Sequence, residues 1–271
     1  MKFLILIFLY LSTLVNLSAQ GIIKAEDLIW KINNNEKVSL QYVVIKGDLD
    51  LTKLENMTMR MQGGTKEYVS EINVELCFKN CEFTGKVIGH EWKDDTKSSF
   101  IVNLNKSVSF IDCNFNKEVN FKHSRFDEKA DFSGSNFLND ANFKHVYFHD
   151  IAHFKNCKFE TYGDFKHASF SGETIFDNSI FHGFAEFKHV HFPNITGFSN
   201  ILFYAGSDFK HAVFSNGVNF SNTEFYKHAD FKHAVFSDPV NFKNIKFKGT
   251  SDFENAHIGH VEIAQYSMNA R

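Results

Sequence analysis

The chain has 271 residues with 29 Lys and Arg against 32 Asp and Glu, so its formal net charge of −3 excludes both a strongly basic nucleic-acid binder and a strongly acidic protein. Its composition departs from a mixed aliphatic core in one respect, because it contains 33 Phe but only 2 Pro and 2 Trp. One apolar residue type in such excess indicates one kind of interior site that is used repeatedly.

The first residues have the pattern of an export signal. Lys2 precedes an apolar run of about 15 residues, and the small residue Ala19 stands before Gln20. We therefore expect a signal peptide over 1–19, cleavage after Ala19, and a periplasmic or extracellular bacterial protein with no transmembrane span after cleavage. The alternative is a retained anchor, although the run is shorter than the roughly 20 apolar residues that span a bilayer.

Residues 20–40 are expected to form a helical cap, because the apolar residues of segment 22–36 recur near helical spacing. These residues are Ile22, Ile23, Leu28, Ile29 and Ile32. The following segment alternates like strands, and we expect its apolar positions to start the first turns of a repeat that continues at irregular spacing. The expected inward positions of this part are Val44, Leu49, Leu51, Ile72, Phe78, Phe83 and Ile88.

From Phe110 to Phe253 the phenylalanines alternate between spacings of five and six residues. Of the 28 Phe in this stretch, 27 follow the alternation and only Phe184 does not. The tripeptide FKH recurs every 22 residues from Phe121 to Phe231, so the repeating unit has 22 residues and four Phe. The sequence therefore predicts a solenoid of four-sided coils.

Neither common alternative accounts for this period. The many Gly, Asn, Ser and Asp residues disfavour an 11-residue helical supercoil, and ordinary strands would alternate with period two. A coil with four short sides, each sending one Phe inward, satisfies both constraints. The expected core is Phe121, Phe126, Phe132, Phe137, Phe143, Phe148, Phe154, Phe159, Phe165, Phe170, Phe176, Phe181, Phe187, Phe192, Phe198, Phe203, Phe209, Phe214, Phe220, Phe225, Phe231, Phe236, Phe242, Phe247 and Phe253.

The repeat resembles the pentapeptide-repeat family, whose unit is a small residue, an Asp or Asn, a large apolar centre and two variable residues. The match is direct in Ala141-Asn142-Phe143-Lys144-His145 and in Ala229-Asp230-Phe231-Lys232-His233, and the resemblance covers about residues 72–258. It implies an all-β fold, a right-handed four-sided parallel β-helix. The chain departs from the family by adding a sixth residue on alternate sides, so it resembles a Phe-rich variant whose coil is longer than four plain pentapeptides.

The expected organisation follows from this register. The β-helix should span 41–258, with irregular coils at 41–109 that include a protruding loop at 89–99, regular coils at 110–258, and a C-terminal tail at 259–271. Small residues two positions before a Phe should point inward and form a column: Val119, Ala141, Gly163, Ala185, Ser207 and Ala229.

Three of the four cysteines fall at interior positions of the register. Cys113 and Cys157 lie two coils apart in one column, about 9–10 Å at strand spacing, which is too far for a disulfide. We expect buried free thiols, and a local bridge between Cys77 and Cys81 is left open.

Residues one repeat apart should stack into surface columns. One column is cationic: Lys122, Lys144, Lys166, Lys188, Lys210 and Lys232. The next holds His123, His145, His167, His189, His211 and His233. One position before the Phe stand Asn120, Asn142, Asp164, Glu186, Asp208 and Asp230.

The His column has two interpretations. Stacked imidazoles are candidate ligands for Zn²⁺ or Cu²⁺, but no Cys or carboxylate cluster completes a closed metal shell. The equivalent position of the opposite corner holds Gly134, Asn156, Asn178, Asn200, Asn222 and Asn244. Gly and Asn tolerate positive φ in turns, so His is interpreted as a corner residue.

We expect no enzyme and no cofactor, because catalysis needs a unique set of residues whereas these polar residues recur in every coil. The non-repeating patch from His90 to Asp95 is too short to define a site. DNA mimicry, known in the family, needs a strongly acidic cytoplasmic protein, and nucleic acid is not expected as a partner. The leading hypothesis is an exported structural or protein-interaction scaffold that binds an unidentified protein or envelope component. The alternative is a metal- or polyanion/glycan-binding module that uses the Lys and His columns, and a homodimer through the C-terminal coil is left open.

Overall fold

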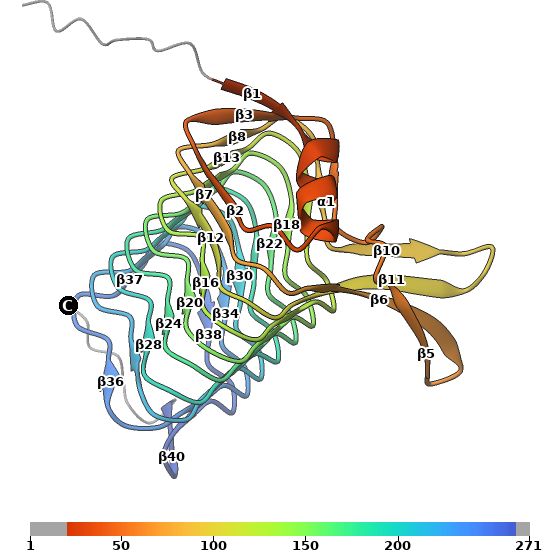
Figure 1. Ribbon diagram of the computed structural model, residues 1–271. Helices are drawn as coiled ribbons and strands as arrows, with labels where there is room; N and C mark the ends of the chain where they lie inside the picture. Colours follow the sequence, from red (N-terminus) through yellow and green to blue (C-terminus); the bar gives the residue numbers. More distant parts are fainter. Residues whose placement is uncertain (1–20, 264–271) are drawn as a thin grey trace, which may run out of the picture.

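The computed structural model describes residues 21–263, which form a four-sided column of parallel strands with one helix at its N-terminal end (Figure 1). The predicted signal peptide, 1–19, and the end of the predicted tail, 264–271, lie outside the described residues. The predicted all-β class and the four-sided parallel β-helix are confirmed. The described residues contain no helix with the length and apolar character needed to cross a membrane.

Each coil contributes one short strand to each of four sheets, numbered here as faces 1 to 4 in chain order. Face 1 contains β2 (Val38–Gln41), β7 (Leu76–Lys79), β12 (Val108–Ile111), β16 (Ala130–Asp131), β20 (Ala152–His153), β24 (Thr174–Ile175), β28 (Thr196–Gly197), β32 (Val218–Asn219) and β36 (Val240–Asn241). Face 2 contains β1 (Gly21–Lys24), β3 (Val43–Lys46), β8 (Glu82–Phe83), β13 (Asn114–Phe115), β17 (Asn136–Phe137), β21 (Lys158–Phe159), β25 (Ile180–Phe181), β29 (Leu202–Phe203), β33 (Glu224–Phe225) and β37 (Lys246–Phe247).

Face 3 contains β4 (Leu49–Asp50), β9 (Val87–Ile88), β14 (Val119–Asn120), β18 (Ala141–Asn142), β22 (Gly163–Asp164), β26 (Ala185–Glu186), β30 (Ser207–Asp208), β34 (Ala229–Asp230) and β38 (Ser251–Asp252). Face 4 contains β5 (Thr58–Gln62), β6 (Thr65–Ile72), β10 (His90–Lys93), β11 (Ser98–Leu104), β15 (Arg125–Phe126), β19 (Tyr147–Phe148), β23 (Ser169–Phe170), β27 (His191–Phe192), β31 (Val213–Phe214), β35 (Val235–Phe236), β39 (His257–Ile258) and β40 (Val261–Glu262).

Phenylalanine rings fill the interior in two geometries. Rings of one column stack nearly parallel, as for Phe165 and Phe187, whose centroids are 5.0 Å apart with an interplanar angle of 2°. Rings from opposite faces meet edge to face across the interior, as for Phe154 and Phe165 at 5.1 Å and 84°. Both arrangements suit the aromatic quadrupole, so each coil is held to the next by ring contacts as well as by strand hydrogen bonds. Phe184, which departs from the spacing, is 39% exposed.

The helix α1 (Ala25–Asn33) caps the first coil. Its buried residues are Ala25, Leu28 and Ile32, spaced so that they share one face of the helix. The prediction that Ile22 and Ile23 belong to this helix was wrong, because both lie on β1, which pairs in parallel with β3 on face 2. The predicted cap is therefore shorter and is preceded by a strand.

Two insertions lengthen the first coils. On face 2 the regular step runs from Asn114 to its partner Asn136, whereas the two preceding steps, from Val44 to Glu82 and from Glu82 to Asn114, both take more chain. The extra residues form antiparallel hairpins, β5–β6 and β10–β11, which project from the column beside α1 (Figure 1). We call the projecting residues, 58–70 and 90–101, the wing. The segment expected as a loop at 89–99 is thus largely hairpin, and the β5–β6 hairpin was not predicted.

Two inward positions of the irregular coils were assigned one residue too early. Val44 is only partly buried, and the interior position is Ile45, which lies opposite Phe83. Ile88 pairs with Asn120, an outward position, so the repeat centre of that coil is Gly89. A Cβ atom at Gly89 would lie 2.6 Å from the ring of Phe121, so this ring takes the space of the missing side chain.

All four cysteines are free, which answers the open question of a Cys77–Cys81 bridge. Cys81, Cys113 and Cys157 are buried, and burial raises the pKa of the Cys157 thiol. These thiols therefore pack as small apolar side chains.

The C-terminal end of the column is only partly closed. Strand β40 folds back antiparallel onto β39 and covers the edge of face 4. Within the described residues the last strands of the other three faces have no further partner. Phe242, Phe247 and Phe253, expected as core, are accordingly only partly buried.

Candidate functional site

The predicted His column lies at the corner between faces 3 and 4. Each of its six members has a φ between 56° and 59°, in the left-handed region. The turn is closed by hydrogen bonds such as that from the Ser124 N–H to the Phe121 carbonyl, at 2.9 Å. Asn156 and its equivalents at the opposite corner have φ of 57–61°. The His residues therefore occupy the backbone conformation that the corner interpretation requires.

The six imidazoles form a continuous stack. Successive centroids are 4.7–4.8 Å apart and interplanar angles are 2–5°. His90 of the wing adds a seventh ring above His123, at 5.5 Å and tilted by 53°. Because ring nitrogens donate in the ring plane, parallel rings direct their lone pairs side by side and do not converge on one ion. Within 21–263 no group of three or more His, Cys, Asp or Glu is arranged to hold a metal.

The stack favours uncharged imidazoles. Burial, followed by the charges of Lys122 and His123, lowers the pKa of His90 to about 4. Burial and the neighbouring rings His123 and His167 likewise lower the pKa of His145 to about 4. Burial also lowers the pKa of the other rings for which a shift is resolved: His123, His167, His189 and His211.

The Lys and acidic columns also serve the corner. The backbone N–H of Lys144 donates to Asn142 Oδ1 at 3.1 Å, and the same bond joins Lys210 to Asp208 at 2.7 Å. This is an Asx-type turn, which explains the recurring Asn or Asp. Ion pairs cross from coil to coil, for example between Lys210 Nζ and Asp230 at 3.3 Å. Lys232 pairs in the same way with Asp252 at 3.2 Å, so the positive charge of the stripe is partly neutralised at its C-terminal end.

A hollow lies at the N-terminal end of face 3, where α1 and β10 border the column. We call this hollow, of about 850 Å³, the groove. It is lined by Glu26, Ile29, Asp48, Asp50, Lys53, Lys86, Val87, Ile88, His90, Glu91, Trp92, Glu118, Asn120, Lys122 and Asn142. A smaller hollow of about 300 Å³ under the wing shares His90, Trp92 and Lys122 with it.

The wing carries large exposed apolar side chains. Met59 and Met61 on β5 are 53% and 62% exposed, and Trp92 on β10 is 47% exposed. Met59 lies opposite Tyr68, whose ring stacks on Phe100 at 4.7 Å, so these three side chains share one side of the wing. Phe100 lies opposite Glu91, so the next residue of β10, Trp92, points to the other side. The wing therefore presents an apolar surface that no other part of the described chain covers.

Comparison with protein families gives a match to a repeat family. Residues 102–146, 143–191 and 187–235 match the model described as pentapeptide repeats, nine copies. The chain belongs to the pentapeptide-repeat family. Searches of curated proteins and of solved structures gave no match.

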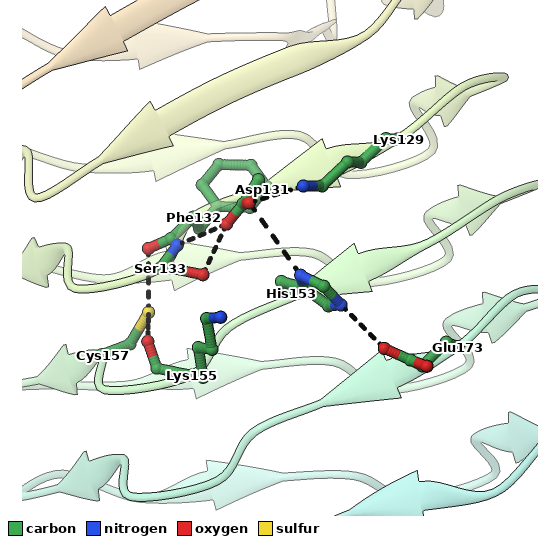
Figure 2. A network of polar contacts seen from close by, with 8 residues as sticks. All are labelled: Lys129, Asp131, Phe132, Ser133, His153, Lys155, Cys157 and Glu173. Atoms are coloured by element: carbon green, nitrogen blue, oxygen red, sulfur yellow. Dashed lines mark hydrogen bonds and ion pairs between the residues drawn. The ribbon is translucent and has the colours of Figure 1, made fainter.

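One polar network of this pentapeptide-repeat protein resembles a reactive cluster. Figure 2 shows Asp131, 5% exposed, accepting hydrogen bonds from the Ser133 N–H and hydroxyl and pairing with Lys129 Nζ at 2.9 Å. Burial raises the pKa of Asp131, but the bonds from Ser133 and Lys129 outweigh burial and hold this pKa below its usual value. His153 lies between the carboxylates of Asp131 and Glu173, with its Nε2 3.1 Å from Glu173 Oε1.

The network holds the coil together and does not form a nucleophilic site. The Ser133 hydroxyl is bonded to Asp131 and not to the imidazole of His153. The Cys157 thiol is buried and donates to the Phe132 carbonyl at 3.0 Å. Pentapeptide-repeat proteins are generally non-enzymatic scaffolds.

The sequence did not predict the groove or the wing, because the groove residues come from five separate stretches of the chain and the wing adds residues 58–70. The one available signal was the non-repeating patch that begins at His90. Three of its residues, His90, Glu91 and Trp92, line the groove.

Proposed function

We propose that this pentapeptide-repeat protein is an exported, non-enzymatic interaction scaffold whose working surface is the wing and the groove. Export is inferred from the pattern of residues 1–19. In this proposal the β-helix is a rod that presents the surface, and the Lys and His columns build its corner.

The observation that carries the proposal is the place where the repeat is interrupted. The coils from Val44 to Glu82 and from Glu82 to Asn114 are both longer than the regular coil that follows them on face 2. The added residues leave the column and expose Met59, Met61 and Trp92. Met and Trp are enriched in protein interfaces, and large apolar side chains gathered outside a core are typical of surfaces that bind a partner.

The repeated columns need no partner to explain them. The His rings occupy left-handed corner positions, the acidic and Asn residues close turns, and Lys210 and Lys232 pair with carboxylates of the next coil. Function is therefore assigned to the part of the chain that departs from the repeat.

The test is purification of the mature protein from its own cell envelope, with bound proteins identified by mass spectrometry. The wing variant Met59→Gln/Met61→Gln removes exposed apolar side chains, and Leu138→Gln, 44% exposed on face 2, is the matched control. We expect a specific partner to be retained by the wild type and by the control and lost with the wing variant, at an unchanged unfolding midpoint. Equal retention by the wing variant, or no retained partner, contradicts the proposal. The intact mass of the exported chain should correspond to a start at Gln20.

A further inference from the structure

Strand β10 has a free edge. It pairs antiparallel with β11, and no other strand of the described chain adjoins it. On an antiparallel edge, alternate residues direct their N–H and C=O groups away from the sheet and can pair with an added strand.

The free edge faces the groove. Successive residues of a strand point to opposite faces of a sheet, yet His90, Glu91 and Trp92 all line this hollow. A hollow that is reached from both faces of a strand runs along its edge. The groove, about 850 Å³ in volume, is therefore bordered by backbone groups of β10 as well as by side chains.

The groove carries an excess of acid. Among its lining residues Lys86 pairs with Glu118 at 3.1 Å and Lys53 pairs with Asp50 at 2.6 Å. The remaining carboxylates are those of Glu26, Asp48 and Glu91, and the remaining ammonium is that of Lys122. Glu91 also lies 3.8 Å from Lys93, which is outside the lining set. The charges of the lining thus favour a cationic ligand.

Trp92 supplies a platform for a cation with an apolar stem. Its indole N–H donates to Asp94 Oδ1 at 2.6 Å, which orients the ring, and 47% of the residue is exposed. A Lys or Arg head group over an indole face gains a cation–π contact, and its methylenes can pack on apolar neighbours. Ile29 and Ile88 provide such neighbours in the groove.

We propose that the groove binds an extended segment of a protein partner, which adds as a strand to the free edge of β10 and places a Lys or Arg side chain over Trp92, while the carboxylates of the lining supply the complementary negative charge. This mode is β-strand addition, in which main-chain hydrogen bonds give affinity and side-chain pockets give specificity. The inference rests on the proposed scaffold function, because it names the chemistry of the partner. An exposed Trp with amide and carboxylate neighbours also suits a sugar, but the free strand edge and the acidic lining favour a basic peptide.

The test is titration calorimetry of the full mature chain with a short synthetic peptide of alternating Val and Lys, at low and at physiological salt. Comparison probes are the Val–Glu peptide, the Val–Lys peptide N-methylated at alternate backbone nitrogens, and a chito-oligosaccharide. The Val–Lys peptide should bind, and its affinity should fall as the salt concentration rises. N-methylation in one of the two alternate registers should lower this affinity at least tenfold.

The protein variants separate the groove from general surface attraction. The variants Trp92→Ala and Glu26→Gln/Glu91→Gln should each lower the affinity for the Val–Lys peptide at least tenfold. Trp30→Ala is the matched control, because the other Trp of the chain is 59% exposed on α1 and does not line the groove. Far-UV circular dichroism should show the same fold for all variants.

Four results would each overturn the inference. The N-methylated or Val–Glu peptides could bind as tightly as the Val–Lys peptide, or the sugar could bind more tightly. Trp92→Ala could bind the Val–Lys peptide with unchanged affinity, or the wild type could fail to bind this peptide. If an envelope partner is still lost with the Met59→Gln/Met61→Gln variant while the Val–Lys peptide fails, the scaffold function stands and the basic-strand chemistry is wrong.

Discussion

Replacing Phe187 with Ala tests the energetic role of the ring columns. Phe187 is fully buried and stacks on Phe165 at 5.0 Å and on Phe209 at 4.9 Å. It also meets Phe176, Phe181 and Phe198 edge to face, at 5.2, 5.9 and 5.3 Å. Truncation removes all five ring contacts and leaves a cavity between coils.

The magnitude follows from burial and packing. Phe-to-Ala changes in cores cost about 3–5 kcal/mol, and a ring with five aromatic partners belongs in the upper half of that range. We therefore expect a loss of about 4 kcal/mol in the free energy of unfolding. The chain offers a control three residues away, because Phe184 is 39% exposed and off the repeat. Phe184→Ala should cost less than about 1 kcal/mol.

The assay is urea unfolding followed by far-UV circular dichroism, with hydrogen exchange to locate the loosened coils. Contacts in a solenoid are made with adjacent coils, so protection should fall first in the coils next to Phe187. Equal destabilisation by the two substitutions would refute the assignment of ring columns as the source of stability.

Three further predictions concern single positions. Ala185→Leu inserts a large side chain into a fully buried column in which Ser207 is the next member. It should lower the free energy of unfolding by about 1–3 kcal/mol. In the same urea assay the control Ala185→Ser should leave this free energy nearly unchanged. Gly89→Ala places a Cβ 2.6 Å from the Phe121 ring and should lower the thermal midpoint, and an unchanged midpoint would contradict the register. The pKa of His145 is lowered to about 4 in the fold, so the unfolded chain binds protons first and stability should fall as the pH drops from about 6.5 to about 4. His145→Asn keeps a residue that tolerates positive φ and should reduce this pH dependence, and an identical midpoint-versus-pH curve for the variant would show that the stack carries no such linkage.

The regular coils could be predicted because the 22-residue period of the sequence corresponds to one coil of the β-helix. Each Phe from Phe110 onward except Phe184 marks one inward side, so spacing alone assigns the faces and the corners. Asn at the corner opposite the His column likewise predicted the left-handed turn, because few residue types tolerate that backbone.

The irregular coils could not be predicted in the same way. At Gly89 the repeat centre has no side chain, and the neighbouring apolar Ile88 was taken for it although the Phe121 ring supplies the missing volume. The hairpins were not predicted for a related reason. Their strands pair outside the column, so their residues do not follow the period of the repeat. The groove depends on these hairpins, so its residues share no spacing in the sequence.

The claim that the wing and groove form the working surface is tested most directly by site-specific photo-crosslinking in the native cell envelope. A photoreactive side chain is placed at Trp92 in one variant and at Leu138, an exposed position of face 2, in the other. The account predicts a discrete protein adduct from position 92 and none from position 138. Adducts from position 138 alone, or the same adducts from both positions, would contradict it.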